Sequence, residues 1–599
     1  MRRPRADFKY RKARITLNLL GLWLLLGGAV SQTPWSQGEQ DGTPVRGGAS
    51  DSREQTMAHA VASARSGGAP IRFEEIAARA GLGFTLRNGA SGSFYQVELM
   101  VAGVATLDYN NDGCMDIFFV NGAELPSLIK TGSGFHNRLY RNNCDVTFTD
   151  VTGKAGLAGE GYSMAAAAGD YDNDGYVDIF VAGVNRNILY HSRGDGTFED
   201  VTTKAGAGGI DPEYGKMWGV SAGWFDYDND GWLDLFVSNY VAWNPRADSL
   251  CNSAEDQFYC HPRVYQGLPN QLFHSNRDGT FTDVSRAAGI GKSIGKGMGV
   301  AFGDFNGDGF TDVFVANDSS PNFLYQNSGD GTFREIALEA GVAFASNGNV
   351  VAGMGADFRD VDDDGLEDIV LSAAHNDTFL MFRNRGAPHF FVDDTLSSGL
   401  AKATSALTGW GLGLYDFDSD GRKDLFVATS HFPGLERFSF TDPALACHVF
   451  HNLGHGRFED VSKSAGPDFQ RRVFHHGAAF ADFNSDGRID VVVSALNSPA
   501  RLYLSTSPGP AHWLALNLVG TSSNRGGLGA RVRLTLPDGS VQYSRATTSV
   551  GYASSSEPLV RFGMGSHDAA SEIEIRWPSG RVQVLRDIRG DQVLAVRER

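Results

Sequence analysis

A nine-residue acidic pattern that occurs seven times constrains the fold of this chain more than any other feature. The pattern reads Asp-x-[Asp/Asn]-x-Asp-Gly-x-x-Asp, and a short apolar segment follows each copy. The copies lie 56 to 78 residues apart, and this spacing indicates a repeat architecture in which each copy belongs to one structural unit. We call them loops 1 to 7, and they begin at Asp108, Asp170, Asp226, Asp304, Asp360, Asp416 and Asp482.

Each repeat contains four segments of strand-like sequence. In the fourth repeat, small residues from Met298 to Gly303 precede the acidic loop, and Asp312 to Ala316 follow it. An Asn-x-Leu-Tyr-x-Asn segment (Asn322 to Asn327) and a Phe-x-x-Ile segment (Phe333 to Ile336) complete the repeat, with a Gly-Asp-Gly-Thr turn between them. Four short strands per repeat are typical of a β-propeller blade. The sequence therefore predicts an all-β, seven-bladed β-propeller.

The strand count also predicts how the ring closes. After loop 7 there are second and third strand segments, Asp490 to Ser494 and Arg501 to Leu504, but no fourth. A spare segment of the fourth type, Phe73 to Ile76, precedes loop 1. We therefore expect residues 72–77 to complete the last blade, which would remove two exposed strand edges.

The end of the chain follows another pattern. Gly/Pro turns separate four segments in which apolar and polar residues alternate, and this predicts a small β-sandwich domain after the propeller. The segments are Trp513–Val519, Ala530–Leu536, Ser571–Trp577 and Val582–Leu585. Three arginines of this domain either contact an acidic partner or are ordinary surface residues: Arg525, Arg531 and Arg545.

These two modules resemble known families. The chain is similar to the FG-GAP/VCBS repeat family, which has the integrin α-subunit type of propeller, and more narrowly to the cartilage acidic protein family, in which an ASPIC/UnbV domain follows the repeats. The resemblance covers about residues 71–598, and it implies a propeller over 71–507, an ASPIC/UnbV-like β-sandwich over 511–598 and an extracellular binding or adhesion role. The ASPIC/UnbV-like segments are His512 to Leu514, Ser523 to Gly526, Gly529 to Val532, Arg561 to Gly565 and Trp577 to Gly580.

This sequence departs from the family pattern at two places. Met564 replaces the usual Leu, and a Cys-Asp-Val turn (Cys144 to Val146) replaces Gly-Asp-Gly in the first repeat.

The acidic loops have the chemistry of a calcium site. Positions 1, 3, 5 and 9 offer side-chain oxygens, position 7 would offer its backbone carbonyl, and Gly at position 6 permits a positive φ. An EF-hand is excluded because its loop needs Glu at position 12 between helices, whereas position 12 is apolar here. An Asx-rich turn without metal is the other interpretation. Flexible, all-protein oxygen ligation favours Ca²⁺ over Mg²⁺, so we expect up to seven structural Ca²⁺ ions.

The predicted ligands are Asp108, Asn110, Asp112, Cys114, Asp116, Asp170, Asp172, Asp174, Tyr176, Asp178, Asp226, Asp228, Asp230, Trp232, Asp234, Asp304, Asn306, Asp308, Phe310, Asp312, Asp360, Asp362, Asp364, Leu366, Asp368, Asp416, Asp418, Asp420, Arg422, Asp424, Asp482, Asn484, Asp486, Arg488 and Asp490. Loops 1, 4 and 7 have Asn at position 3 and should bind more weakly, since each holds one negative charge fewer.

The N-terminus predicts export. Basic residues from Arg2 to Arg14 precede an apolar run, Ile15 to Val30, and a small-x-small site ends at Ser31. Residues 1–31 therefore form a predicted signal peptide, with an uncleaved N-terminal anchor as the alternative, and the Gly/Ser-rich residues 32–70 a flexible linker. The predicted location is secreted, periplasmic or extracellular.

The charge balance narrows the choice of partners. The whole chain has a net charge of −18, and the first 31 residues contain seven basic residues and one acidic residue, so the mature chain carries −24. Such an acidic chain argues against nucleic acid as partner. It would meet a membrane only through an uncleaved N-terminal anchor.

Five cysteines fit an oxidising compartment. Cys251 and Cys260 lie in the long insert between loops 3 and 4 and are predicted to pair. Cys114 and Cys144 lie in loops on one face of a blade and are also predicted to pair, which leaves Cys447 over. Free buried thiols are the alternative for each pair.

The recognition face is predicted from loop lengths. Long segments between second and third strands, 121–136, 239–270 and 431–448, gather on the face opposite the acidic loops, so we place recognition there. A ring of residues at the start of the first strands lies near that face. Their side chains either line a pocket at the mouth of the central channel or pack against one another along the propeller axis. The candidate ligand-binding residues are Met100, Met164, Trp218, Met298, Met354, Trp410 and His476 in the ring, with Lys216, Lys296 and His475 just outside.

The expected function is a calcium-stabilised extracellular module that binds or adheres to a protein or a glycan. The alternative is an enzyme with its active site at the channel mouth, acting on a glycan or a secondary metabolite. The chain contains no Gly-x-Ser-x-Gly, His-Glu-x-x-His, P-loop or Cys-x-x-Cys motif, and this favours the binding module.

Overall fold

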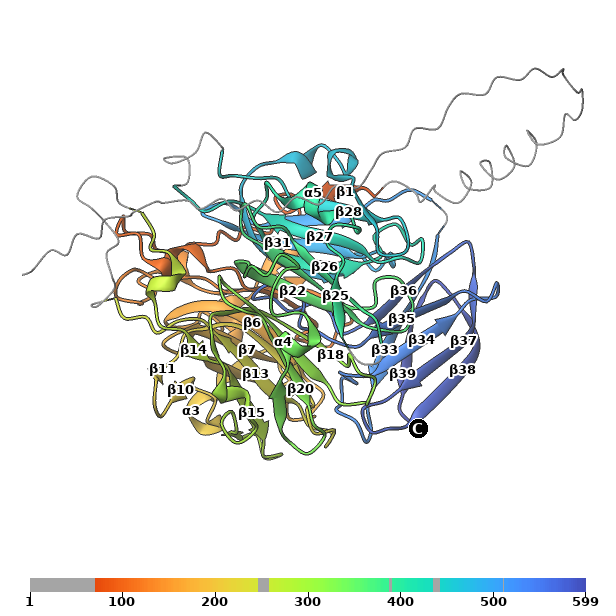
Figure 1. The fold of residues 1–599 in the computed structure, drawn as a ribbon, viewed down its shortest axis with the longest axis horizontal. Coiled ribbons are helices and arrows are strands. Elements are labelled where there is room, and N and C mark those ends of the chain that lie inside the picture. Colours follow the sequence, from red (N-terminus) through yellow and green to blue (C-terminus); the bar gives the residue numbers. More distant parts are fainter. Residues whose placement is uncertain (1–70, 246–257, 387–389, 435–441, 510) are drawn as a thin grey trace, which may run out of the picture. The chain divides into compact units, whose positions relative to one another are not determined.

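The computed structural model describes residues 71–245, 258–386, 390–434, 442–509 and 511–599, which are almost entirely β-structure (Figure 1). The predicted signal peptide and linker lie outside the described residues. Within the described ranges, no helix combines the length and the apolarity needed to cross a membrane.

Seven four-stranded antiparallel sheets carry the seven acidic loops, and we number each sheet by its loop. Each loop joins the first strand of its sheet to the second. The first strands are β2 (Val104–Leu107), β6 (Tyr162–Gly169), β12 (Gly219–Phe225), β18 (Gly297–Gly303), β22 (Gly353–Arg359), β26 (Gly409–Tyr415) and β30 (Phe474–Ala481). The second strands are β3 (Asp116–Phe119), β7 (Asp178–Val184), β13 (Asp234–Asn239), β19 (Asp312–Asn317), β23 (Asp368–Ala373), β27 (Asp424–Thr429) and β31 (Asp490–Leu496).

The outer half of each sheet is a short hairpin. The third strands are β4 (Arg138–Asn142), β8 (Ile188–Ser192), β15 (Gln271–Ser275), β20 (Phe323–Asn327), β24 (Leu380–Asn384), β28 (His448–Asn452) and β32 (Arg501–Ser505). The fourth strands are β5 (Phe148–Asp150), β9 (Phe198–Asp200), β16 (Phe281–Asp283), β21 (Phe333–Glu335), β25 (Phe391–Asp393), β29 (Phe458–Asp460) and, for sheet 7, β1 (Phe73–Glu75).

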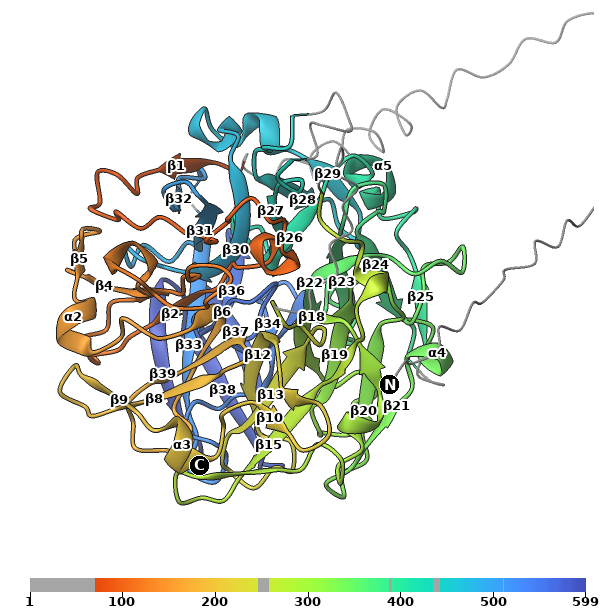
Figure 2. The same cartoon turned by 90° about the vertical axis from the view of Figure 1, so that its left-hand side faces the viewer.

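The first strands contact one another in a closed cycle, from β2 through β6, β12, β18, β22 and β26 to β30 and back to β2 (Figure 2). Small residues make this close approach possible. A Cβ atom at Gly299 would lie 2.5 Å from the carbonyl oxygen of Met354 on the next strand, and one at Gly477 would lie 2.4 Å from that of Ala102. The all-β propeller expected from the repeats is confirmed.

The predicted closure of the ring is also confirmed. Strand β1 pairs with β32, with Phe73 opposite Ser505, and so supplies the fourth strand of sheet 7. The Phe73 ring stacks on Phe469 at 5.4 Å and meets the edge of Phe417 at 5.5 Å. The N-terminal strand of the propeller is therefore held by both backbone pairing and a buried aromatic cluster.

Short helices and two small β-pairs fill the connections. Three of the helices end at a left-handed glycine, which explains the Ala-Gly segments after the fourth strands. The α-helices are α2 (Thr152–Ala155), α3 (Thr202–Ala205), α4 (Ala337–Ala340) and α5 (Leu400–Thr404). The 3₁₀ helices are η1 (Gln96–Leu99), η2 (Ser133–Phe135), η3 (Pro262–Val264), η4 (Ile290–Lys292), η6 (Ser462–Ser464) and η7 (Asp468–Gln470). The β-pairs are β10 (Ile210–Asp211) with β11 (Gly215–Lys216), and β14 (Leu268–Pro269) with β17 (Ile294–Gly295).

The C-terminal domain is a two-sheet sandwich, as expected, with the order β36-β33-β39 in one sheet and β35-β34-β37-β38 in the other. Its strands are β33 (His512–Val519), β34 (Arg531–Thr535), β35 (Val541–Arg545), β36 (Val560–Gly565), β37 (Ala569–Arg576), β38 (Val582–Arg589) and β39 (Gln592–Arg597). The sequence pattern missed β35, β36 and β39. Strand β35 is polar at three of its five positions, so its alternation is weak.

Residues 546–557, which we call the plug, connect β35 to β36 through the centre of the ring. The innermost strand of a propeller sheet is an edge whose backbone groups need partners. The plug supplies them: Gly551 exchanges backbone hydrogen bonds with Ala356, and Ser555 does so with the chain at Val104 and Thr106. It contacts all seven first strands, at Thr106, Ala168, Ser221, Val300, Ala356, Trp410 and Phe480.

Replacing Phe73 should weaken the closure of the ring. Phe73→Ala removes a buried ring, so the free energy of unfolding should fall by about 3–5 kcal/mol in denaturant titration. Leu396→Ala is the matched control, because Leu396 is 84% exposed and should change stability little. Equal stability of the two variants would contradict a closure that depends on β1.

Candidate metal centres and the opposite face

The acidic loops are held in shape by their own carboxylates. In all seven loops the position-1 aspartate accepts the N–H of position 5 at 3.0 to 3.2 Å and the N–H of Gly at position 6 at 2.8 to 3.1 Å. Gly at position 6 has a φ between 87° and 94°. The positive φ predicted there is confirmed. Position 4 is left-handed as well, which explains why it is always Asn, Gly, Asp or Ser.

The position-9 aspartate has a second role that the motif did not reveal. In every sheet its Oδ2 accepts the N–H of loop position 2 at 2.9 to 3.3 Å. Its Oδ1 accepts the N–H of the last residue of the third strand at 2.8 to 2.9 Å. These seven carboxylates are at most 1% exposed. Each one therefore ties loop, second strand and third strand together.

Buried carboxylate oxygens at position 3 lack partners, and this tests whether the loops fit a cation. Among the described residues, Asp228 Oδ1, Asp362 Oδ1 and both oxygens of Asp418 are buried without a hydrogen bond. In loop 2, oxygens of Asp170, Asp172 and Asp174 lie within 4.8 Å of one another. Unpaired buried charges are costly, so oxygens converging in this way fit a divalent cation.

The pKa values of the loop carboxylates also fit a bound cation. Burial raises the pKa of Asp116 to about 8. Burial, with the charge of Asp234, raises the pKa of Asp226 to about 8 as well. For Asp170 and Asp360, burial raises the pKa to about 7. Carboxylates crowded together out of water hold protons unless a cation replaces them, so a bound cation would favour the charged form.

Three histidines join the loops, and the sequence analysis missed them. His191, His274 and His451 each occupy the penultimate position of a third strand. Their Nδ1 atoms lie 3.1 to 3.2 Å from the position-9 carboxylates of loops 2, 3 and 6. A search for His two residues after the Leu or Val of the third strand could have found them.

Arginines of the C-terminal domain contact the acidic loops. Arg545 lies 2.8 Å from Glu367 and 3.8 Å from Asp304. Burial alone would raise the pKa of Glu367, but the charges of Arg545 and Arg531 hold it below its ordinary value. Arg531 lies 3.6 Å from Asp304. The acidic partner considered for these arginines is the propeller of the same chain.

Further contacts extend this docking across the loop face. Arg525 lies 3.7 Å from Asp170 in loop 2, and Arg561 lies 3.5 Å from Asp482 in loop 7. A Cβ atom at Gly487 of loop 7 would lie 1.8 Å from the Trp513 ring, so the indole rests directly on this loop. Between loops 4 and 5 and the domain remains a cavity of about 690 Å³, lined by paired charges such as Arg531 and Asp304.

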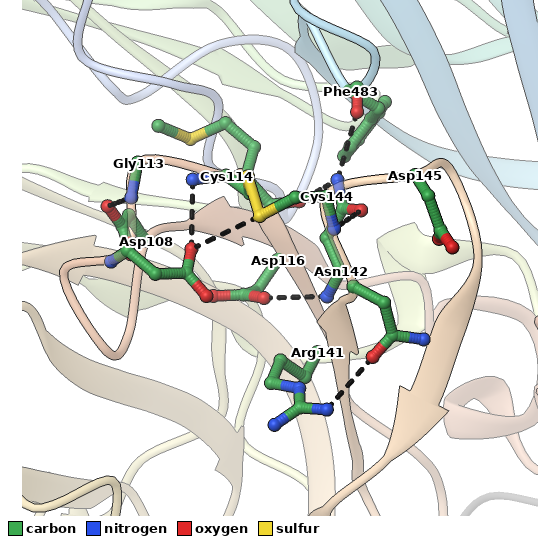
Figure 3. The surroundings of a disulfide bond; sticks show 12 residues. Asp108, Gly113, Cys114, Asp116, Arg141, Asn142, Cys144, Asp145 and Phe483 are labelled. Atoms are coloured by element: carbon green, nitrogen blue, oxygen red, sulfur yellow. Dashed lines mark hydrogen bonds between the residues drawn. A yellow bond between two sulfur atoms is a disulfide. The ribbon is translucent and has the colours of Figure 1, made fainter.

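The cysteines follow the prediction where they are described. Cys114, at position 7 of loop 1, and Cys144, in the turn between β4 and β5, form a disulfide with a Cα–Cα distance of 5.6 Å (Figure 3). Asn142 beside it donates its Nδ2–H to the Phe483 carbonyl of loop 7 and so links sheets 1 and 7. Cys260 is disulfide-bonded, and its predicted partner Cys251 lies outside the described residues. Cys447 is free and buried.

The side chains of the seven residues in the predicted ring are packed together along the propeller axis. None of them is more than 2% exposed. Tyr552 of the plug donates its hydroxyl hydrogen to the Met100 carbonyl at 2.7 Å and lies 5.4 Å from the Trp410 ring, which stacks on His476. The second interpretation of the ring, axial packing, therefore describes these side chains, because the plug fills the space an open pocket would need.

The three residues outside the ring do not converge. Lys216 is exposed, Lys296 is half-buried with its Nζ 3.2 Å from Ser320 Oγ, and His475 is buried against the Leu445 carbonyl.

The chain matches two family models. The family model described as FG-GAP-like repeat matches five segments that together cover more than half of the chain: 108–181, 170–237, 255–315, 304–371 and 416–493. The chain belongs to the FG-GAP-like repeat family. The model described as ASPIC and UnbV matches residues 520–599.

This FG-GAP-like protein is also similar to cartilage acidic protein 1 of two vertebrates. The Homo sapiens protein is 25% identical over 516 residues, which cover 83% of this chain and 71% of the relative. The Xenopus tropicalis protein is 24% identical over 501 residues, covering 80% and 70%. An FG-GAP-like propeller with such relatives fits an extracellular binding module.

Solved structures similar to this FG-GAP-like chain include an Agrocybe aegerita lectin that recognises non-reducing terminal N-acetylglucosamine, with a TM-score of 0.38 and 16% identity over 65% of this chain and 88% of the lectin. YCF48 bound to D1 peptide has a TM-score of 0.38 and 8% identity over 69% and 94%.

Removing calcium should destabilise the FG-GAP-like propeller. Each site adds about 1.4 kcal/mol of stability at tenfold excess of ion over its dissociation constant, and a domain is stable by only ~5–15 kcal/mol. The melting temperature should therefore fall when a calcium chelator is added and recover when calcium is restored. A melting temperature indifferent to the chelator would contradict structural metal sites.

Removing Arg545 should loosen the docked C-terminal domain. Arg545→Ala leaves Glu367 buried without the guanidinium that lies 2.8 Å from it, and such a loss costs about 3–5 kcal/mol. The free energy of unfolding should fall by that amount, and proteolysis between the domains should accelerate. Arg586→Ala is the control, because Arg586 is 70% exposed and pairs at the surface with Glu572. Similar behaviour of the two variants would contradict the electrostatic docking.

Proposed function

We propose that this protein is an exported, calcium-stabilised binding module that recognises an extracellular protein or glycan with the face opposite its acidic loops. The observation that carries the proposal is the position of the C-terminal domain. It contacts loop 2 through Arg525, loops 4 and 5 through Arg531, and loop 7 through Trp513 and Arg561. A partner therefore meets the propeller most readily from the other side.

Long loops meet on that other side. Phe94, from the segment before β2, lies 5.3 Å from the Tyr259 ring of the segment between β13 and β15. A Cβ atom at Gly434, after β27, would lie 3.3 Å from the Phe258 ring. Segments from sheets 1, 3 and 6 thus converge, and their aromatic side chains are half-buried. Half-buried aromatic groups with polar neighbours supply much of the contact area in protein interfaces.

The predicted signal peptide and the oxidised cysteine pair support export. The enzyme alternative needed an open channel mouth, and the packing of the ring around Tyr552 gives it no support.

The test is a binding screen of residues 32–599 against arrays of extracellular proteins and glycans, with calcium present. Phe432, in the segment after β27, is half-buried and lies 5.9 Å from the Trp410 ring. For any ligand found, Phe94→Ser and Phe432→Ser should weaken binding by at least about tenfold, which is the scale of an interface hot spot. Val582→Ser is the control, because Val582 is 56% exposed on the C-terminal domain. Binding that survives both opposite-face variants but fails with the control variant would contradict the proposal.

A further inference from the structure

We propose that loops 2, 3 and 6 are mixed nitrogen–oxygen sites for a divalent transition metal ion of the zinc class, and that the other loops offer oxygen ligands only. The inference rests on the proposed function in treating the acidic loops as metal sites. It goes beyond that function by dividing the loops into two chemical classes and by assigning three histidines as ligands.

The geometry of the three histidine loops is the same. Each histidine approaches its loop from the third strand with Nδ1 pointing between the position-3 and position-9 carboxylates. His191 Nδ1 lies 3.3 Å from Asp172 Oδ2 and 3.2 Å from Asp178 Oδ1. The corresponding distances are 3.7 and 3.2 Å for His274, and 3.6 and 3.1 Å for His451. In each group the three ligand atoms lie within 4.8 Å of one another, so one ion can bind all three.

Loop 6 shows most clearly that a ligand is needed. Asp418 is 6% exposed, and neither of its carboxylate oxygens has a hydrogen-bond partner. Its Oδ2 lies 3.6 Å from His451 Nδ1, beyond hydrogen-bond range, while the same Nδ1 hydrogen-bonds to the fully buried Asp424 at 3.1 Å. A buried carboxylate that finds no donor is costly, whereas an ion between Asp418 and His451 would bind both groups.

The same strand position in the other sheets argues against a purely structural role for these histidines. It holds Arg141, Gln326, Arg383 and Leu504 in sheets 1, 4, 5 and 7. The fold therefore accepts cationic, polar and apolar side chains there and does not require histidine. In sheet 5 the guanidinium of Arg383 contacts Asp362 and lies 4.0 Å from Asp368, in the place where the histidines lie. Sheet 5 contains a permanent cation where sheets 2, 3 and 6 have a metal ligand.

Ligand chemistry then separates the two classes of loop. Calcium takes oxygen ligands almost exclusively, whereas imidazole nitrogen suits zinc and its neighbours in the first transition series. Without an ion, each Nδ1 hydrogen-bonds to the position-9 carboxylate at 3.1 to 3.2 Å. A metal ion that displaces the Nδ1 proton would be bound by imidazole nitrogen and two or three carboxylates, a ligand set that suits zinc, cobalt or manganese. Loops 1, 4 and 7 offer no histidine at this position, and they also carry Asn in place of Asp at position 3.

The test uses Co²⁺ as a spectroscopic probe on the metal-stripped mature chain in millimolar calcium. Three Co²⁺ ions per chain should remain bound and show visible absorption changed by nitrogen ligation. Replacing the three histidines, His191→Gln, His274→Gln and His451→Gln, should weaken Co²⁺ binding by at least about tenfold while calcium binding remains. His512→Gln is the matched control, because His512 pairs with Asp591 at 2.7 Å outside the loops.

A gain-of-site variant keeps the test decisive if the triple variant does not fold. Arg383→His should add a fourth Co²⁺ ion in sheet 5, because loop 5 has Asp at positions 3 and 9, as the histidine loops do. Equal Co²⁺ uptake by wild type and the triple variant, complete displacement of Co²⁺ by calcium, or no gain from Arg383→His would overturn the inference. A chain that binds calcium but no Co²⁺ overturns this inference alone, whereas a chain that binds neither ion also overturns calcium stabilisation.

Discussion

Seven carboxylates removed from water are the constraint on which the rest of this structure depends. The position-9 aspartates, such as Asp116 and Asp312, are fully buried and accept two backbone N–H groups each. Desolvation opposes the charged form of such groups, so they need donors and cations on every side. The loop backbone and the end of the third strand supply these donors, while the arginines of the C-terminal domain contact the position-1 aspartates of loops 2, 4 and 7. The fold is organised around charge compensation as much as around its apolar core.

Different sheets meet this need with different cations. In sheet 5, Arg383 of the third strand lies 4.0 Å from the position-9 aspartate, whereas in sheet 4, Arg545 of the C-terminal domain lies 3.8 Å from the position-1 aspartate. Sheets 2, 3 and 6 have histidines where sheet 5 has Arg383, and histidines are not permanent cations. The seven loops share one motif, yet their dependence on a bound ion must differ, because the protein already supplies part of the positive charge in some of them.

The sequence predicted those features that depend on local patterns of residues. The repeat of the acidic motif predicted the propeller, the spare strand at Phe73 predicted the closure, and loop positions predicted the Cys114–Cys144 disulfide. It did not reveal the plug, since residues 546–557 are small and polar and resemble an ordinary loop. It also missed the histidines, because the segment between loop and third strand varies in length. Such contacts join residues far apart in sequence, and their partners become apparent only when the ring is closed.

The plug links the two faces of the propeller. The plug begins directly after Arg545, which contacts Glu367 of loop 5. Its Tyr552 lies at the far end of the channel. There the Tyr552 hydroxyl binds the carbonyl of Met100, the residue that directly follows η1. The same segment carries Phe94, which contacts the long loop at Tyr259 on the proposed recognition face. The ASPIC and UnbV domain is therefore a structural part of the propeller axis, because one of its segments contacts all seven first strands.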